Sequence, residues 1–257
     1  MTYSVMQTAL EPPTADQLES AFRQVPGLAA LDVTILGKDA FGVLVKGMES
    51  DQALAMQAGL AAQNVGTEIV EDTALPELPP PRQLTKVAFT PEALEIYDVL
   101  GRSLPLEWHE IAVIAAGRVP ISEFTTNLVE KVVMRPSGRH MAPKLVTEAV
   151  TKEEQKDHLL LEIIGRGAAR RYHTRADRPE SLLLFQCLGE RRVKDPAINL
   201  SLFVQQLATF APDALPNHGA FYMSENTNPL FTYSSQTAFY REITWLLWMI
   251  SSGRVQQ

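Results

Sequence analysis

The hydrophobic pattern of residues 1–73 alternates between strand and helix. Thr14 and Gln17 form a capping-box pair, which marks a helix start. The apolar residues that follow recur at spacings of three and four and so share one helical face: Leu18, Ala21, Phe22 and Val25. The other elements predicted here are a strand at Tyr3–Leu10, a hairpin of Leu31–Leu36 and Ala40–Gly47 around Gly37–Asp39, a helix at Asp51–Asn64 capped by Ser50, and a strand at Thr67–Glu71.

This order, β-α-β-β-α-β, predicts a ferredoxin-like module over residues 1–73. The fold serves enzymes, metal carriers, RNA binders and allosteric modules, so it specifies no function by itself. The module lacks a cysteine pair for a metal and an aromatic-basic strand for RNA. An oligomerising, partner-binding or regulatory role is therefore the expectation for it.

A proline-rich segment, residues 74–84, separates this module from the rest of the chain. Its composition is typical of a stiff, extended linker, and a ligand for a proline-recognising domain is the less favoured interpretation. The sequence thus predicts an α+β protein with a ferredoxin-like first domain and a larger mixed α+β domain at residues 85–257.

The second domain begins with a mainly strand-like pattern from Lys86 to Val119. Thr90-Pro91-Glu92 would also suit a helix start, but we favour the strand interpretation. Strand, polar turn, strand and a Trp-containing step, Pro105–Ile111, lead into another apolar strand. This pattern resembles the small barrel of pleckstrin-homology or GRAM domains, and the resemblance implies such a barrel over residues 86–190.

The middle of this domain is more polar. Residues 120–157 contain proline, glycine and many charges, and we interpret them as a long surface insertion. His158–Ile164 and Ala169–Ala176 are predicted to form a hairpin that turns at Gly165–Gly167, and Ser181–Leu188 to form a further strand.

Two helices are predicted to close the chain, within residues 195–250. Asp195-Pro196 is an N-cap with proline in the first turn, followed by apolar residues at helical spacing. The helix at Gln236–Ile250 is apolar on both sides, since Trp245, Trp248 and Met249 lie largely opposite its main apolar face. Such a helix is buried on both sides or covered by a partner, so these three residues are predicted partner-binding residues.

Composition sets further limits. With 46% hydrophobic and 21% charged residues, the chain is in the globular range. No signal peptide or membrane span is predicted, and the single cysteine fits a reducing compartment, so a cytoplasmic location is expected. The net charge of −7 argues against nucleic acid as a partner. Residues 1–85 hold 4 basic and 11 acidic side chains, whereas residues 131–194 hold 14 and 8.

No catalytic or metal-binding motif is recognisable, and no cofactor is predicted. Gly165–Arg170 begins like a dinucleotide fingerprint, but Arg170 stands where a small residue is required. The histidines are scattered without metal-ligand spacing. Three of them remain candidate bases for an enzyme whose site is assembled only by the fold: His109, His173 and His218.

A basic stretch is the most distinctive polar feature. If residues 169–176 form a strand, Arg171, His173 and Arg175 share one face that could bind phosphates or carboxylates, with Arg170 beside them. The favoured alternative is a solvated edge strand, and docking on the acidic N-terminal module is a third. The polar segment Asn217–Asn228 is predicted to be a loop between the closing helices.

The sequence therefore favours a non-catalytic, cytosolic protein-interaction, scaffold or regulatory component that binds a protein partner or itself. Binding of a small anionic ligand through Arg170, Arg171, His173 and Arg175 is the first alternative, and an enzyme without a sequence motif is the second.

Overall fold

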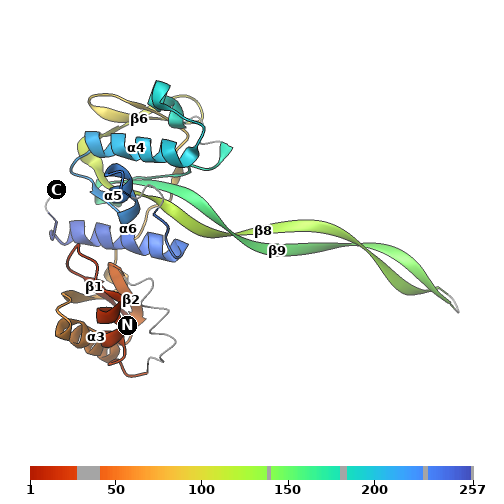
Figure 1. Cartoon of the computed structure of the whole chain (residues 1–257), viewed down its shortest axis with the longest axis horizontal. Helices are drawn as coiled ribbons and strands as arrows, with labels where there is room; N and C mark the ends of the chain where they lie inside the picture. Colours follow the sequence, from red (N-terminus) through yellow and green to blue (C-terminus); the bar gives the residue numbers. More distant parts are fainter. Residues whose placement is uncertain (28–40, 138–139, 180–183, 228–230, 256–257) are drawn as a thin grey trace. The chain divides into compact units, whose positions relative to one another are not determined.

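The computed structural model describes residues 1–27, 41–137, 140–179, 184–227 and 231–255. Over these residues the protein has the predicted mixed α+β fold, and its strands form three β-sheets (Figure 1). The chain forms two compact units. One consists of Met1–Val119 with His158–Gln257, and the other of Pro120–Asp157.

The N-terminal sheet has three strands in the order β2-β1-β3, and both neighbouring pairs are antiparallel. Its strands are β1 (Tyr3–Gln7), β2 (Val43–Met48) and β3 (Thr67–Glu71). Helices α1 (Ala15–Phe22) and α3 (Ser50–Ala62) pack on each other, and α3 packs on β1 and β3. The first strand of the predicted hairpin and its turn, residues 31–39, lie outside the described residues.

Capping explains where these helices begin. Thr14 Oγ1 accepts the Gln17 N–H at 3.3 Å and Gln17 Oε1 accepts the Thr14 N–H at 2.8 Å, which confirms the predicted capping box. The second helix is capped by Glu49 instead of the predicted Ser50, because the Gln52 side chain accepts the Glu49 N–H. A short 3-10 helix, η1 (Asp72–Ala74), follows β3.

The largest sheet has five strands in the order β11-β8-β9-β10-β4. It contains the predicted hairpin, since β10 pairs antiparallel with β9 and Arg171 lies opposite Ile164. The turn includes the 3-10 helix η3 (Arg166–Ala168) with Gly167 at φ +65°, a conformation that favours glycine. The strands are β4 (Arg82–Gln83), β8 (Ile111–Ser137), β9 (His140–Gly165), β10 (Arg171–Arg175) and β11 (Leu215–Pro216).

A third, separate sheet is an antiparallel meander of β5 (Lys86–Phe89), β6 (Ala93–Tyr97) and β7 (Ser103–Glu107), which confirms the strand interpretation of this region. The 3-10 helix η2 (Trp108–Glu110) then carries the chain into β8, in a different sheet. Because this step separates the two sheets, the described residues form no closed barrel, and the barrel implied by the pleckstrin-homology resemblance is corrected.

The remaining helices are α4 (Pro196–Phe210), α5 (His218–Ser224) and α6 (Gln236–Ser251). Asp195 caps α4 and Ser235 caps α6, so both predicted closing helices are confirmed. Two other expectations are corrected. The described part of the strand predicted at Ser181–Leu188 belongs instead to the 3-10 helix η5 (Leu184–Arg191). The predicted loop after Asn217 contains α5, because the Asn217 side chain caps it.

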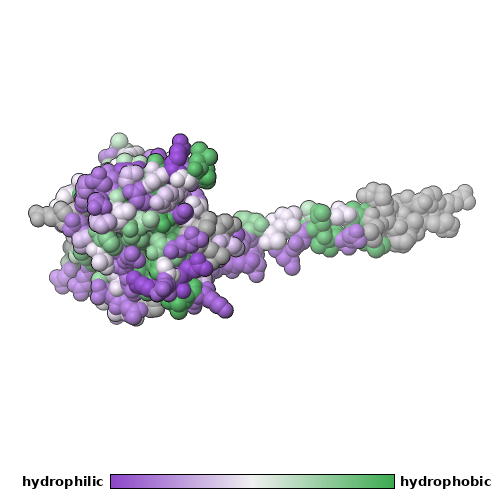
Figure 2. Space-filling model, turned by 90° about the horizontal axis from the view of Figure 1, so that it is seen from above, coloured by the Kyte–Doolittle hydropathy of each residue, from purple (hydrophilic) through white to green (hydrophobic). Residues whose placement is uncertain are grey.

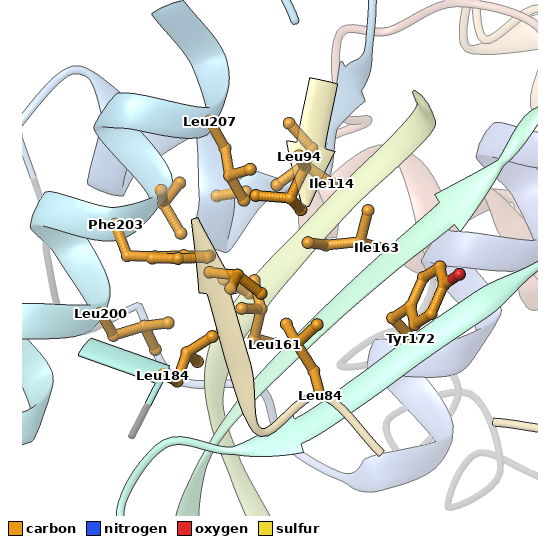
Figure 3. Packing of buried hydrophobic residues seen from close by; sticks show 14 of the residues in the cluster. Leu84, Leu94, Ile114, Leu161, Ile163, Tyr172, Leu184, Leu200, Phe203 and Leu207 are labelled. Carbon is orange, nitrogen blue, oxygen red and sulfur yellow. The ribbon is translucent and has the colours of Figure 1, made fainter. Parts of the chain in front are cut away.

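The main hydrophobic core lies between the large sheet and α4. Figure 3 shows the α4 side chains Leu200, Phe203 and Leu207 facing Ile114, Leu161 and Ile163 of the sheet. A second core joins β1 and β2 to α1 and α3 through Leu18, Phe22, Met56 and Leu60. Within the described part of the chain, no helix combines the length and hydrophobicity that crossing a membrane requires.

The second unit, Pro120–Asp157, consists of the distal parts of β8 and β9, which twist around each other in Figure 1. The sequence predicts a long surface insertion here without assigning strands to it, and the structure shows that its described residues form a two-stranded ribbon. Its two strands are antiparallel. Thr126 contacts Thr151, and Lys131, which is further along β8, contacts Glu148, which is earlier in β9.

Candidate functional site

The predicted basic strand is β10, and its side chains alternate as expected, with Arg171 and His173 half-buried on one face. Both contact a carboxylate of this chain. Arg171 donates from Nε and Nη2 to the two oxygens of Glu162 at 2.7 and 2.8 Å, and His173 Nδ1 lies 2.8 Å from Glu162 Oε1. The Glu162 side chain is fully buried. Two of the predicted anion-binding residues thus surround an anion that the fold itself supplies.

Electrostatics keep Glu162 charged. Burial acts to raise its pKa, but hydrogen bonds and charge from Arg171 and His173 outweigh burial and hold the pKa below its ordinary value. Tyr240 completes the cluster by donating to Glu162 Oε1 at 3.0 Å, and the Arg171 guanidinium lies 5.1 Å from the centre of its ring. The pKa of Tyr240 is raised to about 12 by burial and by the Glu162 charge, so Tyr240 stays a donor.

The other predicted basic residues lie beside this cluster. Arg170 donates to Glu110 Oε1 at 2.7 Å and to the Pro105 carbonyl, which links β10 to the end of β7 and to η2. Arg175 ends β10 on the same face as Arg171 and His173. Anion binding by these residues remains a proposal, in which a ligand would compete with Glu162 and Glu110.

The predicted partner-binding residues of α6 are buried by the chain itself. Trp245 is 1% exposed, Met249 2% and Trp248 6%. Trp245 donates from Nε1 to the Gln7 carbonyl at 2.7 Å, so the second apolar side of α6 packs against the end of β1. Both apolar sides of α6 are therefore buried by residues of the same chain.

The three candidate bases have different surroundings. His109 is largely exposed in η2, 3.4 Å from Glu107. His173 belongs to the Glu162 cluster. His218, the first residue of α5, lies 2.8 Å from the buried Glu242 and lines a cavity of about 470 Å³. A cavity that holds a histidine beside a carboxylate is the feature that raises the enzyme or ligand-binding alternative.

The ribbon unit presents two chemically different faces. Its ion pairs lie on one face, where Lys131 pairs with Glu148 at 2.7 Å and Lys156 with Glu123 at 3.6 Å. Residues two apart in a strand share a face, so the opposite face is the one on which Thr126 meets Thr151 at 3.1 Å.

That opposite face is apolar and open to solvent. It carries Phe124, Leu128 and Val132, which are 69%, 75% and 63% exposed. We define the apolar face of the ribbon by its described residues with apolar or hydroxyl side chains: Phe124, Thr126, Leu128, Val132, Thr147, Ala149 and Thr151. Figure 2 shows hydrophobic patches along the part of the ribbon that is not grey. Such a row of exposed apolar side chains is typical of an interaction surface.

Sequence reasoning missed these residues because proline, glycine and charge dominated the interpretation of residues 120–157. The signal was available: Phe124, Leu128 and Val132 recur at a spacing of four between polar residues, which is compatible with one face of a strand.

Among the residues that the structure describes, no group of three histidine, cysteine, aspartate or glutamate side chains could hold a metal ion. Cys187 is half-buried in η5, and burial raises the pKa of its thiol to about 12. No family model, curated protein or solved structure matches the chain.

Proposed function

We propose that the protein is a non-catalytic interaction component that assembles through its ribbon unit, and that the ribbon binds the ribbon of a second copy. The observation that carries the proposal is the exposed apolar face opposite an ion-paired face. On the ion-paired face, the charges neutralise each other and offer little to a partner. Burial of the apolar face of the ribbon releases water from apolar surface and so favours binding.

Strand geometry supports the ribbon as a contact surface. A strand rises about 3.3 Å per residue and neighbouring strands lie about 4.8 Å apart, so one face from Pro120 to Val132 covers on the order of 400 Å². Two such faces in contact bury about 800 Å², which is typical of a weak or transient interface. A two-stranded ribbon is only marginally stable in water by itself, and a second ribbon packed on its apolar face removes that weakness.

Charge predicts how the association responds to salt. Glu130 lies between Leu128 and Val132 on the apolar face of the ribbon, and Glu153 lies on the same face in β9, so two copies bring like charges together within the contact. Salt screens this repulsion and strengthens apolar contact. Self-association is therefore expected to tighten as salt rises, whereas binding to a basic partner would weaken.

The test is size-exclusion chromatography with light scattering over a range of protein concentrations. The wild-type chain is expected to show twice its 28.5 kDa mass. Replacing Phe124, Leu128 and Val132 together by serine removes most of the apolar contact and weakens the dimer by at least about 100-fold, or about 3 kcal/mol.

The matched control is Val129→Ser, in the same strand on the ion-paired face, which is expected to leave the dimer intact. A wild-type chain that stays monomeric at the highest concentration it tolerates contradicts self-association. A dimer that survives the triple serine variant places the interface elsewhere.

We infer that residues 1–73 are a ferredoxin-like module, supported by the order β2-β1-β3 and by the alternation of its strands and helices along the chain. We also propose a cytoplasmic location, supported by the single cysteine of the sequence, which suits a reducing compartment.

A further inference from the structure

A buried carboxylate at the centre of α6 organises a second polar cluster, separate from the ribbon unit. Glu242 is 3% exposed. Its Oε1 accepts the backbone N–H of His218 at 2.7 Å and lies 2.8 Å from His218 Nδ1, and its Oε2 accepts the Tyr233 hydroxyl at 2.5 Å. Both carboxylate oxygens are therefore engaged by groups of this chain.

The position of His218 is set by the start of α5. The Asn217 Oδ1 atom accepts the N–H groups of Ala220 and Ala116, each at 2.9 Å, and so ties the helix start to β8. Gly219 allows the close approach, because a Cβ at this position would lie 2.0 Å from the Ala116 carbonyl oxygen. The imidazole is thus held between a helix start, a strand and the carboxylate.

Hydrogen bonding assigns the imidazole protons. Burial and the Glu242 charge raise the pKa of Tyr233 well above its ordinary value, so its hydroxyl donates to Glu242 Oε2, while the Asn217 Nδ2 group donates to the Tyr233 oxygen at 2.7 Å. A carboxylate only accepts, so Nδ1 of His218 carries the hydrogen. In the neutral ring Nε2 is then a hydrogen-bond acceptor.

His218 forms part of the wall of two cavities that share lining residues, of about 370 and about 470 Å³. Volumes of this size suit a small organic molecule. Aromatic rings surround the imidazole: Phe41 lies edge-on with its centre 4.2 Å from that of His218, and Phe231 is nearly parallel at 6.0 Å. Other apolar or aromatic lining residues include Leu10, Pro12, Phe221, Tyr222, Trp245 and Leu246.

We infer that the His218 ring is neutral and that these cavities form a binding site for a small phenol, whose ring packs among Phe41, Tyr222 and Phe231 and whose hydroxyl donates to His218 Nε2. The aromatic walls select a planar apolar ring. An acceptor nitrogen selects a hydroxyl over a carbonyl.

Two other ligand classes fit the cavities less well. No lysine or arginine is among the described residues that line them, which disfavours an anion. A cation would require the Glu242 charge, but the oxygens of Glu242 already accept from His218 and Tyr233. The phenol site is independent of the ribbon, because its residues belong to the other compact unit.

The test compares two probes of similar shape, 4-methylphenol and its methyl ether 4-methylanisole, by calorimetry and by the absorbance of the aromatic ring at neutral pH, where a phenol with a pKa of about 10 keeps its O–H. The ether lacks the O–H, so wild-type protein is expected to bind the phenol at least about tenfold more tightly, the value of one hydrogen bond of about 1.4 kcal/mol. The bound phenol is also expected to show a red-shifted absorbance.

The variant His218→Phe keeps a ring but removes Nε2, so it is expected to bind both probes with equal affinity. His109→Phe, at an exposed histidine outside the cavities, is the matched control and is expected to keep the preference. Equal binding of both probes by the wild-type chain, binding of neither, or a preference that survives in His218→Phe overturns the inference. The wild-type comparison decides the matter even if His218→Phe does not fold.

Discussion

At the scale of residues, the most consequential side chain is Glu162, which the sequence placed inside an apolar strand without a role. The register explains its importance, because Glu162 lies directly opposite His173 and two residues from the position opposite Arg171. Cross-strand neighbours on one face interact, so a cationic face of β10 required an anion on β9. The predicted turn at Gly165–Gly167 contained the information needed to pair them.

Replacing this carboxylate is predicted to destabilise the protein strongly. Glu162→Gln leaves Arg171 and His173 without their buried anion and is expected to lower the free energy of unfolding by about 3 kcal/mol, measured by urea denaturation. Glu148→Gln, which breaks the exposed pair with Lys131, is the control and is expected to stay close to wild type. Equal effects of the two variants would contradict the assigned role of burial.

The pH dependence follows from the lowered pKa of Glu162. A group whose folded pKa lies below its unfolded value contributes stability above the unfolded value, and the contribution disappears as the pH falls through the folded pKa. The difference in unfolding free energy between wild type and Glu162→Gln is therefore expected to be full at neutral pH and to shrink below the ordinary value of 4.5. Urea denaturation repeated from neutral to acidic pH measures it.

At the scale of elements, α6 is a helix that the sequence predicted correctly, but the sequence did not show which residues pack against it. Its two apolar sides were visible in the sequence, and so was the requirement that both be covered. The cover on the Trp245 side comes from residues near β1 and β2, more than two hundred positions earlier: the Gln7 carbonyl accepts from Trp245, and Phe41 contacts its ring.

A glycine at the start of β2 allows this contact. Gly42 has φ +68°, and a Cβ there would lie 2.6 Å from Trp245 Cγ. Gly42→Ala is expected to lower the free energy of unfolding by about 2–4 kcal/mol, because backbone strain adds to overpacking. Thermal and urea denaturation measure the loss.

The matched control for this variant is Gly101→Ala, since Gly101 has φ +76° but no atom within 4 Å of the added Cβ. Gly101→Ala is expected to lower the free energy of unfolding only by the backbone strain, about 1–2 kcal/mol. A Gly42 variant no less stable than the Gly101 variant would mean that the Trp245 ring moves aside at no cost.

At the scale of the whole molecule, the two compact units are expected to be energetically separate. Every described residue of the two hydrophobic cores lies outside residues 120–157. Deleting residues 122–155 and joining the strands by an Asn-Gly turn is therefore expected to leave Tm within about 3 °C of the monomeric wild-type value.

The same deletion is expected to abolish self-association in light scattering and to leave 4-methylphenol binding unchanged. Unfolding of the shortened chain would show that the ribbon stabilises the rest of the protein. Loss of phenol binding without loss of fold would show that the phenol site depends on the ribbon.

The sequence by itself determined the α+β class, most of the helices and strands, and the caps of two helices. These features depend on groups within three or four positions of each other, such as Thr14 with Gln17 and Asp195 with the start of α4. The same local reasoning failed at Leu184–Arg191, where apolar composition suits a strand and a 3-10 helix alike.

Only the tertiary structure decided which distant groups meet. Glu242 with His218, Trp245 with Gln7, and the apolar face of the ribbon all depend on register and packing between segments far apart in the chain. The physical reason is that a side chain's burial and charge partner depend on everything packed around it, whereas its helix or strand preference depends mainly on its neighbours along the backbone.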